Sequence, residues 1–460
     1  MKALHDPTNA LASGLSAIRT QYKVPEGFPP AVLAAAEAAA KRVPNEHIDR
    51  TDRSFVTLDP ARSTDLDQAF ALEKSGADLL LHYAIADVAW FVEDGDLLDT
   101  EAWRRGTTQY LPDGKASLYP PVLSEAAASL LPNGPRAAIV FTVSVAPDGE
   151  VALQGVERAL IKSRAKLAYD KVRASDLPPE FDALASRILA AEVRRGAARV
   201  DPPEQEVSSL GGGQFALVFA PTLVSETQNA AMSLATNLAV AKLLFAHQTG
   251  LFRVMAAPDD AAVARLRMTA RAYGLNWPAA LSLEAYGRTL DLTESKQAAL
   301  SLAIRRAGKG ASYTPWQEGV VPWHAAMAAT YAHATAPLRR LADRYVIRAA
   351  LALANGKPVP DAVVQAFPKL PDVMARAGAL SGQLDRAVID LAESVMLKGR
   401  EGEVFAAVVT EVDERGARIQ LSNLPVVARV AAPLAKPGDS LQVALTATDL
   451  ERRAVTFIVR

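Results

Sequence analysis

Three aspartates, Asp59, Asp65 and Asp67, lie close together in the segment TLDPARSTDLDQAFAL at residues 57–72. Carboxylates this near one another repel and cost desolvation energy, so a chain tolerates them where a cation sits among them. Asp65 and Asp67 are separated by one residue, Leu66, as are side chains on one face of a strand. Asp59 can return to that face across the Pro60 turn. Hard oxygen ligands in a chain without cysteine indicate Mg²⁺, with Mn²⁺ as the substitute ion.

An acidic segment of this kind also occurs as a solvated turn that caps its own backbone. Composition narrows the choice, because 460 residues suffice for two or three domains with large cores. The absence of cysteine excludes disulfides and thiolate zinc sites, so we expect a reducing, cytoplasmic environment. The sequence shows neither a signal peptide nor an uncharged membrane span, so we expect no secretion and no membrane partner.

The formal net charge is −1 at pH 7, so the whole molecule has no long-range basic field toward nucleic acid. A polyanion would have to bind at local patches of positive charge. No segment indicates a protein partner, and we expect a monomer.

One such patch is YAHATAPLRR at residues 331–340. Pro337 stands where a helix can begin, so we expect the Thr335 hydroxyl and the first unpaired amides to meet an anion there. Arg339 suits a phosphate because its guanidinium group binds two oxygens at once and keeps its charge.

Hydrophobic periodicity predicts the elements that position these segments. Strands are predicted at residues 55–58, 68–72, 78–85, 137–145 and 151–159. Helices are predicted at residues 7–22, 31–42, 165–173 and 179–195 and over most of 224–398. In the last region, Arg344 and Arg348 repeat at helical spacing and are expected to form a solvated basic stripe.

The C-terminal segment has a different pattern, with short alternating strands at residues 404–412, 417–421, 425–431, 440–447 and 455–459. Five strands in so short a segment suit a small OB-fold barrel, a fold that often binds single-stranded nucleic acid. At the other end of the chain, the two predicted helices would form a small module, with a helix-turn-helix as one arrangement.

Several segments, in this order, resemble the ribonuclease II and R family of processive exoribonucleases: VTLDPARSTDLDQAF, LHYAIADVAWFV, QYLPDG, IKSRAKLAYDKV and YAHATAPLRRLADRY. The resemblance implies an α+β fold with three parts. These are a helical N-terminal module at residues 1–50, a mixed sheet-and-helix RNB catalytic domain at 51–398, and a five-stranded OB-fold RNA-binding domain at 400–460.

By the same resemblance, Asp59, Asp65 and Asp67 bind Mg²⁺ at the scissile phosphate, and Arg339 clamps that phosphate; these four residues form the catalytic set. The residues implied to contact RNA are Tyr110, which packs on the 3′-terminal nucleotide, and Lys166, Tyr169, Glu226, His333, Thr335 and Arg340.

The chain also departs from the family pattern. The acidic run ends in Gln68 where the family has a further aspartate; an amide oxygen can bind a metal ion, so Gln68 joins the expected ligands without adding charge. An ungapped match puts Ala230 and Ala231 at two acidic positions of a later helix, which leaves Glu226 as the candidate partner for base stacking. A later family glutamate becomes Asp385, and the family's cold-shock domains have no room in this chain.

We therefore expect a metal-dependent hydrolytic exoribonuclease that degrades single-stranded RNA processively from its 3′ end to nucleoside 5′-monophosphates. The first alternative is a catalytically silent RNA-binding protein of the same fold, because of Gln68 and the missing glutamates. The second is a structural adaptor whose acidic loop is only a solvated turn.

Overall fold

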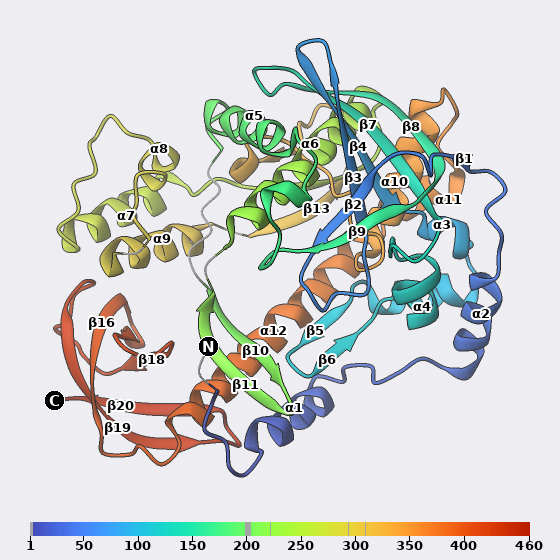
Figure 1. Cartoon of the computed structure of the whole chain (residues 1–460). Coiled ribbons are helices and arrows are strands. Elements are labelled where there is room, and N and C mark those ends of the chain that lie inside the picture. Colours follow the sequence, from blue (N-terminus) through green and yellow to red (C-terminus); the bar gives the residue numbers. More distant parts are fainter. Residues whose placement is uncertain (1–2, 198–203, 221, 293, 309) are drawn as a thin grey trace.

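The computed structural model describes residues 3–460 except 198–203, 221, 293 and 309. A seven-stranded mixed sheet dominates the fold (Figure 1). In order across this sheet, the strands are β1 (Ile48–Asp49), β8 (Val151–Ile161), β7 (Arg136–Val145), β4 (Asp78–Ala86), β3 (Gln68–Ser75), β2 (Phe55–Asp59) and β9 (Ser163–Ala168). Neighbouring strands are antiparallel except at the two edges, where β1 runs parallel to β8 and β9 parallel to β2.

The helices are α1 (Ala10–Gln21), α2 (Pro30–Ala40), α3 (Val88–Phe91), α4 (Leu97–Arg105), α5 (Phe181–Arg194), α6 (Val224–Ala246), α7 (Asp260–Ala272), α8 (Leu283–Gly287), α9 (Ser295–Ala307), α10 (Leu341–Ala354), α11 (Asp361–Ala366) and α12 (Leu370–Leu397). Two hairpins pair β5 (Gln109–Leu111) with β6 (Gly114–Ala116) and β10 (Glu204–Gly211) with β11 (Gln214–Ala220). A small sheet has the order β13 (Ala311–Pro315), β12 (Leu251–Met255), β14 (Trp323–His324) and β15 (Ala329–Thr330).

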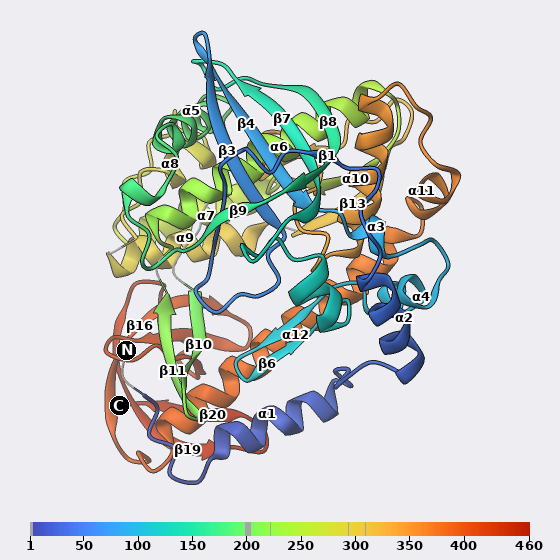
Figure 2. The ribbon, with the colours of Figure 1, turned by 45° about the vertical axis from the view of Figure 1, so that its right-hand side comes forward.

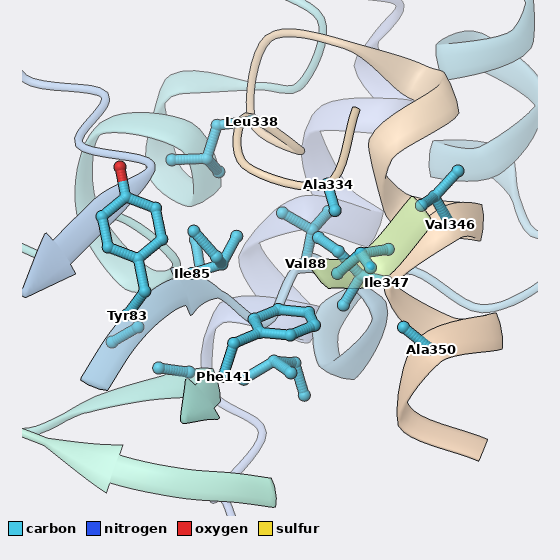
Figure 3. Packing of buried hydrophobic residues seen from close by; sticks show 14 of the residues in the cluster. Tyr83, Ile85, Val88, Phe141, Ala334, Leu338, Val346, Ile347 and Ala350 are labelled. Atoms are coloured by element: carbon cyan, nitrogen blue, oxygen red, sulfur yellow. The ribbon is translucent and has the colours of Figure 1, made fainter. Parts of the chain in front are cut away.

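The main core lies between the large sheet and helices α6 and α10. Consecutive residues of β4 and β7 are buried, which indicates that both faces of the sheet centre are covered. Helix α6 packs against β4, β7 and β8, and α10 packs against β8. Figure 3 shows Phe141 of β7 beside Ile347 of α10, with Ala334 and Leu338 of the preceding loop reaching the same cluster.

Helix α6 is long and apolar enough to cross a membrane by length and composition alone. The sequence-based expectation concerned an uncharged span, and α6 contains the charged residues Glu226 and Lys242. In the protein, 67% of its most apolar window is buried. Packing on three strands accounts for the apolar character.

Helix α12 is the long helix against which the elements in the lower part of Figure 2 pack. Its apolar face packs against α1, which runs beside it in Figure 2, and against the β10–β11 hairpin. Helix α2 packs instead against α4, in the main core cluster. The two N-terminal helices therefore pack on different parts of the protein rather than on each other as in a helix-turn-helix.

The C-terminal strands form a five-stranded antiparallel sheet in the order β18 (Val427–Val430), β17 (Gly416–Leu421), β16 (Val404–Asp413), β19 (Ser440–Asp449) and β20 (Ala454–Val459). The two outer strands, β18 and β20, approach each other, so the sheet curls into a nearly closed OB-like barrel. The predicted α+β fold with a C-terminal barrel is confirmed. The Glu393 carboxylate of α12 ties the barrel to the body, because it accepts hydrogen bonds from the Val427 amide (2.7 Å) and the Gln205 side chain (2.6 Å).

The helix predicted at residues 165–173 was wrong, because strand β9 begins at Ser163 and ends at Ala168. Ala165, Leu167 and Tyr169 pack against the core at the strand period of two, and the backbone pairs with β2. Sheet pairing here overrides the helical propensity of the residues. The region 224–398 is likewise less helical than predicted, because the β12–β15 sheet interrupts it.

The solvated basic stripe predicted on α10 was also wrong. The Arg344 side chain is only 1% exposed and is paired with the Asp99 carboxylate; it also donates to the Tyr345 hydroxyl at 2.7 Å. Arg348 is bound by both carboxylate oxygens of Asp94, and its side chain is 19% exposed. The two arginines anchor α10 to the segment around α4.

We predict that Arg344→Met lowers the free energy of unfolding by about 3–5 kcal/mol, because the substitution leaves the buried Asp99 without its cation. The matched variant Arg348→Met breaks a more exposed pair and should cost about 0–1 kcal/mol. Urea unfolding followed by circular dichroism measures both values. Equal losses in the two variants would show that burial does not distinguish the pairs.

Candidate active site

The acidic cluster forms where two neighbouring strands meet a shared loop. Asp59 is the last residue of β2, and Asp67 directly precedes β3, its neighbour in the sheet. Leu66 is fully buried between Asp65 and Asp67, and its backbone amide and carbonyl are bound by the Ser129 hydroxyl and the Leu130 amide. Burial of this one leucine leaves its two acidic neighbours on the opposite side of the chain.

Asp67 is the most deeply buried aspartate of the cluster, with 4% of its surface exposed. One of its oxygens accepts a hydrogen bond from the Leu338 amide at 2.7 Å, and the other lies 3.4 Å from Arg339 Nε. Burial raises the pKa of Asp67 to about 7, although the Arg339 charge opposes that rise. The carboxyl group is therefore about half ionised near neutral pH, and a bound cation would favour its charged form.

Asp59 has the least satisfied carboxylate. Its Oδ2 atom is buried and has no hydrogen-bond partner in the part of the chain that the structure describes. Burial raises its pKa to about 7, and the nearby charges of Arg339 and Lys166 offset the rise only in part. A buried acceptor without a donor is where a cation would be stabilised most.

Asp65 differs from the other two because protein groups bind both of its oxygens. Lys115 Nζ lies 2.7 Å from Oδ1, and the Tyr110 hydroxyl donates to Oδ2 at 3.0 Å. Lys115 also contacts Glu125 at 3.1 Å. Neither Lys115 nor Glu125 is among the residues predicted from the sequence, although Lys115 directly follows the QYLPDG segment.

Arg339 is the cation closest to Asp67, and 43% of its side chain is exposed. It lies in an irregular loop, because α10 begins at Leu341 and not at Pro337. The Thr107 hydroxyl and the Thr108 amide hold the Arg339 carbonyl at 2.6 and 3.0 Å. The loop thus fixes the backbone of Arg339 and leaves its guanidinium group partly open to solvent.

The expected anion site at the start of that helix is not formed. The amides of Thr335 and Ala336 both donate to Asp343 Oδ2, at 3.0 and 2.8 Å. The Thr335 hydroxyl is buried, 3.4 Å from the Asn237 side-chain nitrogen. Thr335 therefore supports the loop from within, and its predicted contact with RNA stays a prediction.

Arg340 and His333, like Thr335, are bound by residues inside the protein. Arg340 makes two hydrogen bonds to Asp343, at 2.9 and 2.7 Å. His333 Nδ1 lies 2.7 Å from the Tyr313 hydroxyl, and burial together with the Arg340 charge lowers its pKa well below the usual value. His333 is therefore neutral at neutral pH, and neither side chain lies in the acidic cluster.

Three further predicted residues lie close to the cluster: Tyr169 and Glu226 line the cleft beside it, and Lys166 contacts the acidic loop. The Tyr169 hydroxyl accepts a hydrogen bond from the Asn229 side chain at 2.9 Å, and burial raises its pKa to about 12. Lys166 Nζ donates to the Ala61 carbonyl at 3.0 Å and so holds the acidic loop. Glu226 caps the first turn of α6 through the Leu223 amide at 2.7 Å.

Gln68 is held by hydroxyl groups. Its side-chain oxygen accepts hydrogen bonds from the Ser233 hydroxyl, at 3.0 Å, and from the Tyr83 hydroxyl. Both donors come from within the core, on α6 and β4. The expected metal-binding role of Gln68 stays a prediction.

A cleft of about 870 Å³ opens beside the cluster. Its lining residues come from the acidic loop, the β5–β6 hairpin, the β10–β11 hairpin, the start of α6 and the middle of α12, and they include Asp65, Tyr110, Tyr169, Glu226 and Asp385. The Tyr110 residue is 51% exposed, so its ring is available to a base. The fold thus places a stacking surface next to the carboxylates.

The donor set fits a hard divalent ion, with carboxylate oxygens and the unpartnered Asp59 Oδ2. In the positions found here, the described residues include no group of three or more His, Cys, Asp or Glu side chains close enough to hold a metal ion together. Lys115 and Arg339 instead lie against Asp65 and Asp67.

Two family models match the chain. The RNB domain covers residues 47–355, and the C-terminal S1 domain of RNase II-type exonucleases covers residues 403–460. The chain belongs to the RNB family. The resemblance drawn from the sequence segments is thereby confirmed.

Individual RNB proteins are similar over most of this chain. Ribonuclease R of Aquifex aeolicus is 26% identical over 89% of this chain, which spans 61% of that relative's length. The structure of Mycoplasma genitalium RNase R in complex with ribose methylated single-stranded RNA has a TM-score of 0.87, with 19% identity, over 98% of this chain and 78% of the other. Yeast Ssd1, described as a pseudonuclease, has a TM-score of 0.70 with 15% identity, over 96% of this chain and 59% of its own. The fold is therefore shared by proteins with and without nuclease activity, and the site has to decide between them.

We predict that Asp59→Asn stabilises the metal-free protein at pH 8. A carboxyl whose folded pKa is raised stabilises the fold below its ordinary pKa near 4, and that contribution is lost as the pH rises through about 7. The gain from removing the charge should be about 1–4 kcal/mol at pH 8 and should vanish near pH 4.

Thermal unfolding in a chelator from pH 4 to pH 8 measures this difference. The exposed Asp52→Asn serves as the control and should show no such pH dependence. A stability difference between Asp59→Asn and the unchanged protein that is the same at both pH values would contradict the assignment.

Proposed function

We propose that this chain is a metal-dependent hydrolytic exoribonuclease that removes nucleoside 5′-monophosphates from the 3′ end of single-stranded RNA. The observation that carries the proposal is the meeting of the half-buried Asp59 and the buried Asp67 with the partly exposed Arg339, beside a cleft that presents Tyr110. Such a convergence of carboxylates, a phosphate-binding cation and a stacking ring supports phosphodiester hydrolysis.

The carboxylates of the acidic cluster would hold Mg²⁺, or Mn²⁺ in its place. When bound, the ion supplies a Lewis acid and lowers the pKa of a water molecule. Arg339 stabilises the negative charge that develops on the phosphoryl oxygens, because its fork can bind two of them. Water attacks the last phosphorus, and the 3′ oxygen of the preceding nucleotide leaves with a proton, so the released nucleotide keeps the phosphate on its 5′ carbon.

Binding of the RNA end would rest on stacking and on local charge. Tyr110 offers an exposed ring that accepts any base, which gives affinity without sequence preference. Selection of RNA over DNA requires contacts to the 2′-hydroxyl group within the cleft. Retention of the shortened strand in such a site is what processive digestion requires.

A second cleft, of about 650 Å³, supports binding of the strand further from its 3′ end. It lies between α9, α12 and the barrel, and shares Gln205 and Ile389 with the first cleft. Its lining includes five arginines, Arg305, Arg306, Arg386, Arg418 and Arg429. Guanidinium groups gathered along one path suit a phosphate backbone, although the whole molecule is nearly neutral.

The same proposal covers the setting of the protein. We infer that the enzyme is cytoplasmic, because the chain has no cysteine and its proposed substrate is RNA. We also infer that it acts as a monomer. The competing candidate is a silent RNA-binding protein, favoured by one observation, the neutral Gln68 engaged by two hydroxyl groups. Hydrolysis of a labelled oligoribonucleotide in Mg²⁺ or Mn²⁺ decides between them.

We predict that Asp67→Asn reduces hydrolysis to less than about a tenth while RNA affinity changes little, since the substitution removes a ligand charge and keeps the shape. Single-turnover cleavage and fluorescence anisotropy of the same oligoribonucleotide measure the two effects. Turnover near that of the unchanged protein would remove Asp67 from the catalytic set. Binding without turnover in the unchanged protein would favour the silent binder.

We predict that Arg339→Lys lowers the cleavage rate at least about tenfold and RNA affinity much less, because lysine keeps the charge and loses the two-pronged contact. Arg348→Lys is the matched control, since Arg348 is paired with Asp94 away from the cluster. Equal losses of rate and affinity in Arg339→Lys would instead mark Arg339 as a general anchor for RNA.

A further inference from the structure

Lys115 is a cation inside the acidic cluster that the proposed chemistry does not use. Its ammonium group lies 2.7 Å from Asp65 Oδ1 and 3.1 Å from Glu125 Oε1, and its side chain is 19% exposed. Glu125 is fixed in turn, because it accepts a hydrogen bond from the Thr64 hydroxyl at 2.7 Å. Lys115 is thus held between two carboxylates rather than extended into solvent.

The β5–β6 hairpin fixes this position. Lys115 is the cross-strand partner of Tyr110, so the ring and the ammonium group leave the hairpin side by side and bind the two oxygens of one carboxylate, Asp65. The hairpin is held at both ends. Asp113 in its turn forms two hydrogen bonds to Arg19 of α1, at 3.2 and 2.8 Å, and Gln109 donates to the Ala377 carbonyl of α12 at 3.3 Å.

The three aspartates are consequently unequal. Both oxygens of Asp65 are taken by side chains. Among the residues that the structure describes, Asp59 Oδ2 is buried without a partner, and Asp67 Oδ2 lies 3.4 Å from Arg339. Gln68, the residue after Asp67, carries no negative charge, and its side-chain oxygen is engaged by the Tyr83 and Ser233 hydroxyl groups. The cluster therefore has less charge to offer divalent ions than three aspartates alone would suggest.

We propose that Lys115 is the resident cation of Asp65, so that the cluster binds one divalent ion, through Asp59 and Asp67, and Lys115 supplies the second positive charge. This assignment rests on the proposed function and names the ion stoichiometry of its site. A divalent ion at Asp65 would have to displace the ammonium group or lie a few ångströms from it, and like charges at that separation repel strongly in a partly buried site. A fixed ammonium group there can also attract the phosphate that the ion binds.

The test is the binding of Mn²⁺ to the full chain in the absence of RNA, followed by the electron paramagnetic resonance signal of the unbound ion. We expect the unchanged protein to bind one Mn²⁺ at the cluster. Lys115→Gln, which keeps the length of the side chain and removes the charge, should bind a second Mn²⁺ or bind the first at least about tenfold more tightly. Lys115→Arg keeps the charge and should behave as the unchanged protein does.

The matched control is Lys242→Gln, which removes a surface lysine paired with Glu150 and should leave Mn²⁺ binding unchanged. Lys115→Met, which keeps the apolar stem, repeats the test if glutamine disturbs the hairpin, as circular dichroism would reveal. Two ions in the unchanged protein, or identical titrations for it and the neutral variants, would overturn the role of Lys115 and leave the proposed function standing. Absence of Mn²⁺ binding in every variant would overturn the metal dependence of the proposed function together with this assignment.

Discussion

The loop that carries Arg339 depends on one buried carboxylate. Asp343 is completely buried in the first turn of α10, where it binds the amides of Thr335 and Ala336 and the guanidinium group of Arg340. These bonds give an irregular loop a single conformation, since a buried charge stays stable only while its donors remain in place. The same conformation carries the Leu338 side chain into the core.

From that loop the arrangement extends to the acidic cluster. The Leu338 amide reaches Asp67, and Arg339 follows it along the chain. The carboxylates meet at the end of adjacent strands, where burial opposes their ionisation. Burying these carboxylates close together lowers the stability of the fold, and bound cations would offset that cost. Functional sites differ from the rest of a core in this way.

Sequence patterns were most informative where local spacing determines structure. The alternation of apolar and polar residues predicted the barrel strands, and the same two-residue period predicted that Asp65 and Asp67 point to one side of the chain. Such a period can be recognised without knowledge of the tertiary structure. The segment at 165–173 misled, since its helix-forming residues are overridden by pairing with β2. The burial of Arg340 and Arg344 could not be predicted in the same way. The spacing of basic residues along a helix is the same whether their side chains meet water or a buried aspartate. Their partners lie on other turns or other elements, so only the folded chain reveals the burial.

Helix α12 sets a distance between the two clefts. Asp385 faces the first cleft, and Glu393, eight positions later, binds the barrel strand β18. Eight helical residues span about 12 Å, which is about three to four stacked nucleotides at 3.4 Å each. Under the proposed function, α12 would carry an RNA strand over about this distance from the barrel to the acidic cluster, along a path that is continuous because Gln205 and Ile389 line both clefts.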